Sequence, residues 1–195
     1  MNLNRDVAAD DEGLSLVELI FYVVILGLIT TGIAVVFFNT WKAQASVSDQ
    51  VDATERGQLV SSQIEKAMRN AVAYEITDPT LTSSLSSGPT LVVATAMSGS
   101  NACMAFNLNG GTAQLTTTSG ARVAAAPWPT WQSGISQHKN SGGVLVPFFV
   151  QVGSDVAYSF DVTSANGPTV HFEGTAYLRN PSWGTLPGGG TQSCF

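Results

Sequence analysis

The chain has 195 residues, which leaves room for one globular domain besides a terminal segment. Charged residues make up only 11% of it, against about a quarter in typical domains, and the formal net charge is −6. Lys and Arg form no cluster that would pair with phosphates, so this composition argues against direct nucleic-acid binding.

Residues 1–13 are polar and acidic, and they lack the apolar stretch of an ordinary secretory signal. We expect them to be a short cytoplasmic leader that is removed. The leader holds one of the eight Lys and Arg residues and four of the 14 Asp and Glu residues, so 7 basic and 10 acidic residues remain. The rest of the chain is therefore mildly acidic.

An unbroken apolar run extends from Leu14 to Phe38 and carries a single charged side chain, Glu18. As a helix, a run of this length measures about 37 Å, enough to cross the roughly 30 Å hydrocarbon core of a bilayer. The run predicts a transmembrane helix over 14–38. A carboxylate in hydrocarbon costs at least about 2.5 kcal/mol, so Glu18 needs a partner or a proton, unless it reaches back one helical turn to the lipid headgroups.

The string from Gly13 to Ile20, Gly-Leu-Ser-Leu-Val-Glu-Leu-Ile, resembles the class III signal of type IV prepilins and pseudopilins. This resemblance implies that a prepilin peptidase cuts between Gly13 and Leu14 and then N-methylates Leu14, with Glu18 fifth in the product. The Glu18 carboxylate of one subunit would pair with the Leu14 amine of its neighbour, which offsets the desolvation of both charges. The acidic leader departs from the usual positive one, so orientation rests on the resemblance and not on charge bias.

Gly27 and Gly32 lie in the second half of the apolar run, with Thr30 and Thr31 between them. These residues lower helix propensity and offer a flat surface for close helix approach. This stretch could be a site of local unwinding in a filament. Equally, Gly27 and Gly32 could be ordinary packing glycines in a helix that only anchors the chain.

Residues 39–78 contain good helix formers, no Pro before Pro79 and spread-out charges, so we expect an extracytoplasmic amphipathic helix there. Apolar residues follow a 4-3-4-3 spacing along one face, which two valines continue upstream: Val60, Ile64, Ala67, Ala71 and Tyr74, with Val47 and Val51.

After Pro79 the pattern changes to short β-like runs separated by Gly, Pro, Asn and Ser, which predicts a β-rich globular region over 79–195. Residues 80–88 and 122–141 read as irregular. The expected strands are 90–96, 102–108, 112–118, 143–152, 156–162 and 170–178, with a turn at 109–111 and Pro147 at a bulge or edge. The alternation in 156–162 and 170–178 makes this pair the clearest hairpin. The predicted architecture is α+β: a long N-terminal helix, partly transmembrane, packed on an antiparallel β-sheet, as in pilins.

Cys103 and Cys194 are the two cysteines, and neither belongs to a Cys-x-x-Cys or a Cys/His set with metal spacing. If the domain lies outside the membrane, we expect them to form a disulfide. The alternative is two free thiols.

The sequence contains no nucleophile elbow, phosphate loop or zinc-protease motif. We therefore expect no enzyme activity, no catalytic or metal-binding residues and no cofactor. His138 and His171 are the only histidines, and His171 falls on the polar face of the last hairpin, where a solvated or cross-strand role is expected. Asp155, Asp161 and Glu173 can approach one another across that hairpin.

Trp128 and Trp131 stand between prolines in the irregular region. They are candidates for an exposed contact site, because Trp is enriched at binding hot spots. The alternative is that at least one of them packs in the core.

Residues 55–71 and 176–180 resemble, more weakly, the helix and last strand of minor pilins and pseudopilins of the PilW and GspJ kind. The resemblance implies a structural subunit of a type IV pilus or type II secretion-like filament. Its partners would be the prepilin peptidase, the inner-membrane assembly machinery and other pilin subunits through the N-terminal helix. The protein would cross the cell membrane once before assembly and then lie in a filament at the cell surface.

Two other classes of protein remain open. A signal-anchored surface binding domain would use Trp128 and Trp131, would not be cut at Gly13 and would tolerate Glu18→Ala. An anchored hydrolase would show convergent acids in a cleft.

Overall fold

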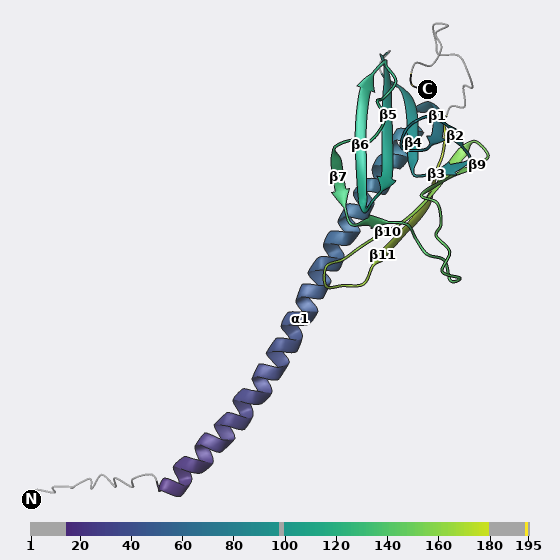
Figure 1. The fold of residues 1–195 in the computed structure, drawn as a ribbon. Coiled ribbons are helices and arrows are strands. Elements are labelled where there is room, and N and C mark those ends of the chain that lie inside the picture. Colours follow the sequence, from purple (N-terminus) through teal and green to yellow (C-terminus); the bar gives the residue numbers. More distant parts are fainter. Residues whose placement is uncertain (1–14, 98–99, 180–193, 195) are drawn as a thin grey trace, which may run out of the picture. The chain divides into compact units, whose positions relative to one another are not determined.

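The computed structural model describes residues 15–97, 100–179 and 194. The chain divides into two compact units, 1–45 and 46–195, called here the N-terminal unit and the globular unit. One helix and two antiparallel sheets make up the described part, which confirms the α+β class (Figure 1). The elements are α1 (Leu16–Arg69), β1 (Ala71–Thr77), β2 (Ser84–Leu85), β3 (Ser87–Gly88), β4 (Thr90–Met97), β5 (Ser100–Asn109), β6 (Thr112–Ser119), β7 (Thr130–Ser133), β8 (Ile135–Ser136), β9 (Phe149–Val152), β10 (Asp155–Val162) and β11 (Val170–Ala176).

The helix ends earlier than the sequence predicts. Asn70 closes it by donating its side-chain amide to the Lys66 carbonyl at 2.8 Å, which satisfies one of the carbonyls that a helix end leaves free. The expected helix over 39–78 is therefore wrong after Arg69, because β1 takes up Ala71–Thr77 and pairs with β4. The spacing of Ala71 and Tyr74 matches a helix only by coincidence. Their conformation is set by the hydrogen bonds that β1 makes with β4.

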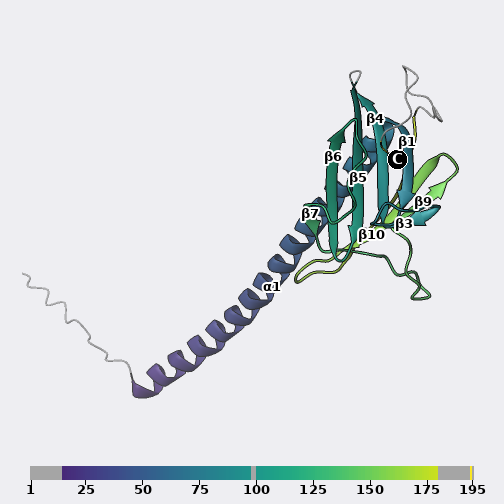
Figure 2. The same ribbon diagram turned by 45° about the horizontal axis from the view of Figure 1, so that its top comes forward.

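The first sheet has six strands in the order β2-β1-β4-β5-β6-β7 (Figure 2). The hairpin of β5 and β6 turns at Gly110 and Gly111, whose φ angles of 59° and 81° lie in the left-handed region. This conformation suits the predicted Asn-Gly-Gly turn. The predicted strands 90–96, 102–108 and 112–118 are confirmed to within about two residues at each end.

The second sheet has the order β11-β10-β9-β3, with β8 also paired to β10. The predicted hairpin of 156–162 and 170–178 is present, with Val162 opposite Val170 and Val156 opposite Ala176. The expected strand over 143–152 is reduced to β9, which begins two residues after Pro147. Four short strands, β2, β3, β7 and β8, lie in regions that the sequence suggested were irregular.

Within the globular unit, α1 and both sheets share one apolar core. The buried face of α1 consists of Ala53, Gly57, Val60, Ile64, Ala67 and Met68. Its partners in the sheets include Leu91, Val93, Phe106, Leu108, Phe149, Val156 and Phe160. Val47 and Val51, which continue the helical spacing upstream, are about 60% exposed and lie outside this core.

A second apolar cluster covers the opposite face of the first sheet. Alternation along β4 and β5 produces the two faces: Leu91 and Val93 point to the first core, while Val92 and Ala94 belong to the second cluster. The cover on this side is Leu81, Val123, Trp128 and Cys194. Both faces of this sheet are therefore buried at its centre.

Candidate functional site

The N-terminal stretch of α1 is exposed and apolar. Leu16 is 75% exposed, Phe21 64% and Ile25 51%, and by length and composition the helix can cross a membrane. In the described residues, this is the one helix that meets that test. Apolar side chains with this much exposed surface are stable only when lipid or other apolar helices surround them.

Glu18 lies in the first turn of α1, where the helix dipole favours a negative charge. The Tyr22 hydroxyl, one turn further on, donates to the Glu18 carboxylate at 3.4 Å. That bond is long, so the carboxylate keeps most of its capacity to accept hydrogen bonds from another group. The predicted cleavage residues Gly13 and Leu14 lie outside the described residues.

The helix continues without interruption through Gly27 and Gly32. The hydroxyls of Thr30 and Thr31 donate back to the carbonyls of Leu26 and Gly27, each at 2.7 Å. Such bonds hide the hydroxyls inside the helix, so this stretch presents an apolar surface with small residues.

Cys103 and Cys194 are joined in a disulfide, with their Cα atoms 5.4 Å apart, as the sequence suggested. Cys103 is fully buried in β5 and Cys194 is 3% exposed. The bond ties a residue near the end of the chain to the first sheet.

Trp128 and Trp131 have different surroundings. Trp128 is 8% exposed and donates its indole N–H to the Ala124 carbonyl at 2.8 Å, so it is a core residue and not an exposed contact. Trp131, in β7, is half-buried and packs against the first core. A contact role stays a prediction for Trp131 alone.

Of the three hairpin acids, Asp161 and Glu173 each contact His171, whereas Asp155 has other partners. Asp161 bonds to both histidines: His138 Nδ1 lies 3.0 Å and His171 Nδ1 lies 2.7 Å from its Oδ1 atom. Glu173 lies 3.5 Å from the other nitrogen of His171. Asp155 instead accepts the backbone N–H of Leu178 at 3.1 Å.

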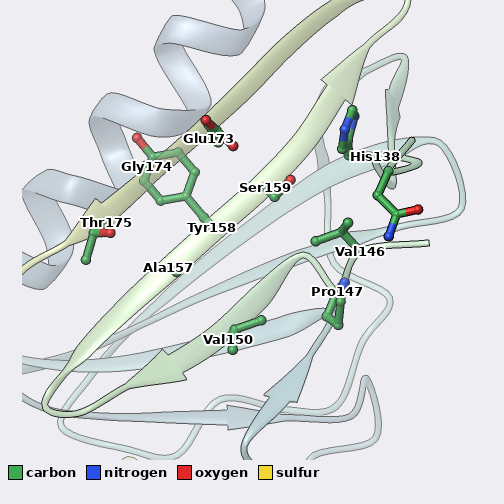
Figure 3. Close-up of a pocket in the computed structure, with 11 residues that line it drawn as sticks. His138, Val146, Pro147, Val150, Ala157, Tyr158, Ser159, Glu173, Gly174 and Thr175 are labelled. Carbon is green, nitrogen blue, oxygen red and sulfur yellow. The ribbon is translucent and has the colours of Figure 1, made fainter. Parts of the chain in front are cut away.

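A surface hollow of about 600 Å³ lies beside this cluster, with His138 and Glu173 among its lining residues (Figure 3). Most of its lining residues come from β9, β10 and β11, and Val146 and Pro147, which precede β9, also line it. Tyr158 covers Gly174, where any side chain would collide with the phenol. The Tyr158 hydroxyl donates to Glu65 at 2.7 Å, and burial, followed by this bond, raises its pKa.

Sequence reasoning missed the cluster of His138, Asp161 and His171. One signal was available: the predicted pairing of 156–162 with 170–178 places Asp161 opposite His171. His138 gave no such signal, because it follows the two-residue strand β8, whose pairing with β10 has no visible pattern in the sequence.

Comparison with known proteins leaves the family open. No protein-family model matches the chain, and no curated protein and no solved structure matches it.

Proposed function

We propose that the chain is a structural subunit, of the minor pilin or pseudopilin type, of a type IV pilus or type II secretion-like filament. The observation that carries the proposal is Glu18: it is the one charged side chain of the exposed apolar run that ends at Phe38, and it lies five residues past Gly13. A lone membrane anchor gains nothing from a carboxylate at this place, whereas a filament uses it.

Assembly begins with hydrolysis of the peptide bond between Gly13 and Leu14. The cut leaves an α-amino group on Leu14, which the same peptidase methylates. Glu18 of one subunit then pairs with this amine in the next subunit and sets the axial register. The apolar side chains of α1, exposed in the single chain, pack against those of neighbouring subunits in the filament core.

The same proposal also assigns a cellular compartment to each part of the chain. Before assembly the helix crosses the inner membrane, where the prepilin peptidase and the assembly machinery act on it. The globular unit is extracytoplasmic, in keeping with the Cys103–Cys194 disulfide, because such bonds persist in oxidising compartments.

Intact mass and N-terminal sequencing of the protein from cells with and without a prepilin peptidase test the processing step. We expect a product that begins at Leu14, carries one extra methyl group and forms only with the peptidase. If Met1 persists in both strains, the filament proposal fails and an anchored surface domain takes its place.

Glu18→Ala separates processing from assembly. We expect the variant to be cut after Gly13 but to be lost from sheared filaments, because its carboxylate no longer meets the neighbouring amine. The matched control is Glu55→Ala, which removes an exposed carboxylate further along α1 and leaves filament incorporation unchanged. Incorporation of the Glu18→Ala protein at the wild-type level contradicts the proposed pairing.

A further inference from the structure

Three side chains with metal-binding atoms meet on the outer face of the second sheet: His138, Asp161 and His171. One ligand atom from each lies within 4.8 Å of the other two. The buried residues of β10 are Val156, Tyr158, Phe160 and Val162, so Asp161 falls on the opposite, outward face. The cluster is therefore separate from the apolar core.

Strand register places the three groups side by side. Asp161 is on β10, with His171 directly opposite on β11 and Ser136 directly opposite on β8. His138 lies two residues past Ser136, and residues two apart along an extended chain point to the same side. Three segments far apart in sequence thus converge on one carboxylate.

We propose that His138, Asp161 and His171 bind a divalent transition-metal ion of the zinc type through the two Nδ1 atoms and an oxygen of Asp161. Two imidazoles and one carboxylate are a frequent ligand set for such ions, whereas Ca²⁺ and Mg²⁺ prefer oxygen alone.

The distances require little adjustment. Bond lengths of about 2.0–2.1 Å in a tetrahedral site separate neighbouring ligand atoms by about 3.3 Å. The nitrogen–oxygen distances are 3.0 Å from His138 and 2.7 Å from His171, so the side chains open by a few tenths of an ångström to admit the ion. The ring protons then reside on the Nε2 atoms.

Glu173 supplies the outer support that metal-bound histidines usually have. Its carboxylate lies 3.5 Å from His171 Nε2, the nitrogen that carries the proton when Nδ1 binds the metal. At this distance, with the Glu173 side chain 79% exposed, the contact favours the tautomer that the site needs without fixing it.

The site keeps an open coordination position. The side chains of His138, Asp161 and His171 are 31%, 18% and 32% exposed, so water or a group from another molecule can approach the ion. Three protein ligands with one free position differ from the closed four-ligand set of structural zinc sites. The hollow lined by His138 and Glu173 adjoins the site.

The simpler interpretation is that the two histidines only hydrogen-bond to Asp161. The ring geometry suits more than this, because both rings direct Nδ1 at the same oxygen and their centroids are 3.8 Å apart, so a single ion at that point meets all three ligand atoms.

The test uses the full-length chain, carried in detergent micelles, without a histidine tag and stripped of metal by a chelator. Titration with CoCl₂ reports d–d absorption of a four- or five-coordinate site, and ZnCl₂ followed by calorimetry gives the stoichiometry. We expect one ion per chain, with Zn²⁺ displacing Co²⁺. Absence of saturable binding overturns the proposal.

Variants then locate the site. Asp161→Asn and His171→Gln each lower Zn²⁺ affinity by about a hundredfold or more, since losing a ligand costs more than losing an outer partner. Glu173→Gln lowers the affinity at most about tenfold, because its contact is long and exposed. Glu55→Gln removes an exposed carboxylate on α1 and leaves the affinity unchanged. Circular dichroism without metal verifies that each variant is folded, and wild-type affinity in folded Asp161→Asn and His171→Gln shows that the cluster is only a hydrogen-bond network. Processing at Gly13 is not involved, so this result is independent of the proposed function.

Discussion

Asp78 closes the turn after β1 by accepting hydrogen bonds from three threonines, Thr77, Thr80 and Thr82. The Thr80 hydroxyl donates at 2.7 Å, while Thr82 donates its backbone N–H at 3.0 Å and its hydroxyl at 2.9 Å. These bonds, that of Thr80 first, lower the pKa of Asp78 to about 2. The carboxylate is therefore a structural acceptor even though it faces solvent.

The first prediction concerns the pH dependence that Asp78 produces. Because its pKa is lower in the folded state than in the unfolded state, its contribution is complete above the unfolded pKa near 3.8 and disappears as pH falls toward 2. We expect Asp78→Asn to be less stable than wild type at pH 7 and the gap to narrow steadily from pH 4 to pH 2. Denaturant unfolding of both proteins at each pH measures the gap, and a gap independent of pH contradicts the assignment.

Tyr158 joins the second sheet to α1 through its hydroxyl, which donates to Glu65 at 2.7 Å. Tyr158 is 5% exposed and Glu65 is half-buried, so the bond is partly shielded from water. We expect Tyr158→Phe to lower the free energy of unfolding by about 1.5–3 kcal/mol, the usual range for a hydrogen bond to a charged group. Glu65→Gln keeps a neutral acceptor and serves as the comparison in denaturant unfolding, where a smaller loss is expected.

At the scale of elements, the docking of α1 on the second sheet depends on Gly57. The Phe172 ring of β11 occupies the place of a side chain there, and a Cβ atom would overlap it. The same ring stacks on Phe160 with centroids 5.4 Å apart, so it has little freedom to move aside. At the other end of this contact, Asn166 donates to Asp49 of α1 at 2.6 Å.

Gly57→Ala is the corresponding prediction. Alanine gains up to about 1 kcal/mol in helix propensity, but overpacking costs about 1–3 kcal/mol, so we expect a net loss of stability. Phe172→Leu makes room for the methyl group, and the double variant should be less destabilised than the sum of the two single variants. A double-mutant cycle in denaturant measures this coupling, and a Gly57→Ala protein more stable than wild type contradicts it.

Arg56 adds polar contacts on the same stretch of helix. Its guanidinium donates to the Ser133 carbonyl at 2.8 Å and to the Thr163 carbonyl at 3.2 Å, and its Nε atom lies 3.1 Å from the Asp52 carboxylate. Ser133 is the last residue of β7 and Thr163 comes directly after β10, so the two carbonyls belong to different sheets. A single side chain of α1 therefore links the ends of strands from both sheets.

At the scale of the molecule, the disulfide closes a loop with a sequence separation of 91 residues. In the chain-entropy model a loop of this size contributes up to roughly 4–5 kcal/mol, mostly by restricting the unfolded chain. We expect reduction, or the variant with both Cys103→Ser and Cys194→Ser, to lower the free energy of unfolding by a large part of that amount. Unfolding with and without reductant measures it, and equal stability in both conditions contradicts the expectation.

How much of the structure can be predicted from the sequence differs along the chain, for physical reasons. Apolar residues in an unbroken run specify the exposed stretch of α1 without help from other segments, because length and composition decide whether a helix can cross a bilayer. Alternation and turn residues likewise specify the β5–β6 and β10–β11 hairpins, since their partners are adjacent in sequence. The proposed leader and the proposed cut at Gly13 also rest on the sequence alone.

The tertiary structure decided what depends on distant partners. Residues 71–77 have a pattern that suits both a helix and a strand, and pairing with β4 selects the strand. Trp128 is buried because the second cluster covers the first sheet, and His138 reaches Asp161 because β8 pairs with β10. The local conformational propensity of a residue contributes little free energy compared with such long-range pairing and burial. The sequence by itself therefore determined the helix and the hairpins, whereas the tertiary structure determined which side chains meet on the second sheet.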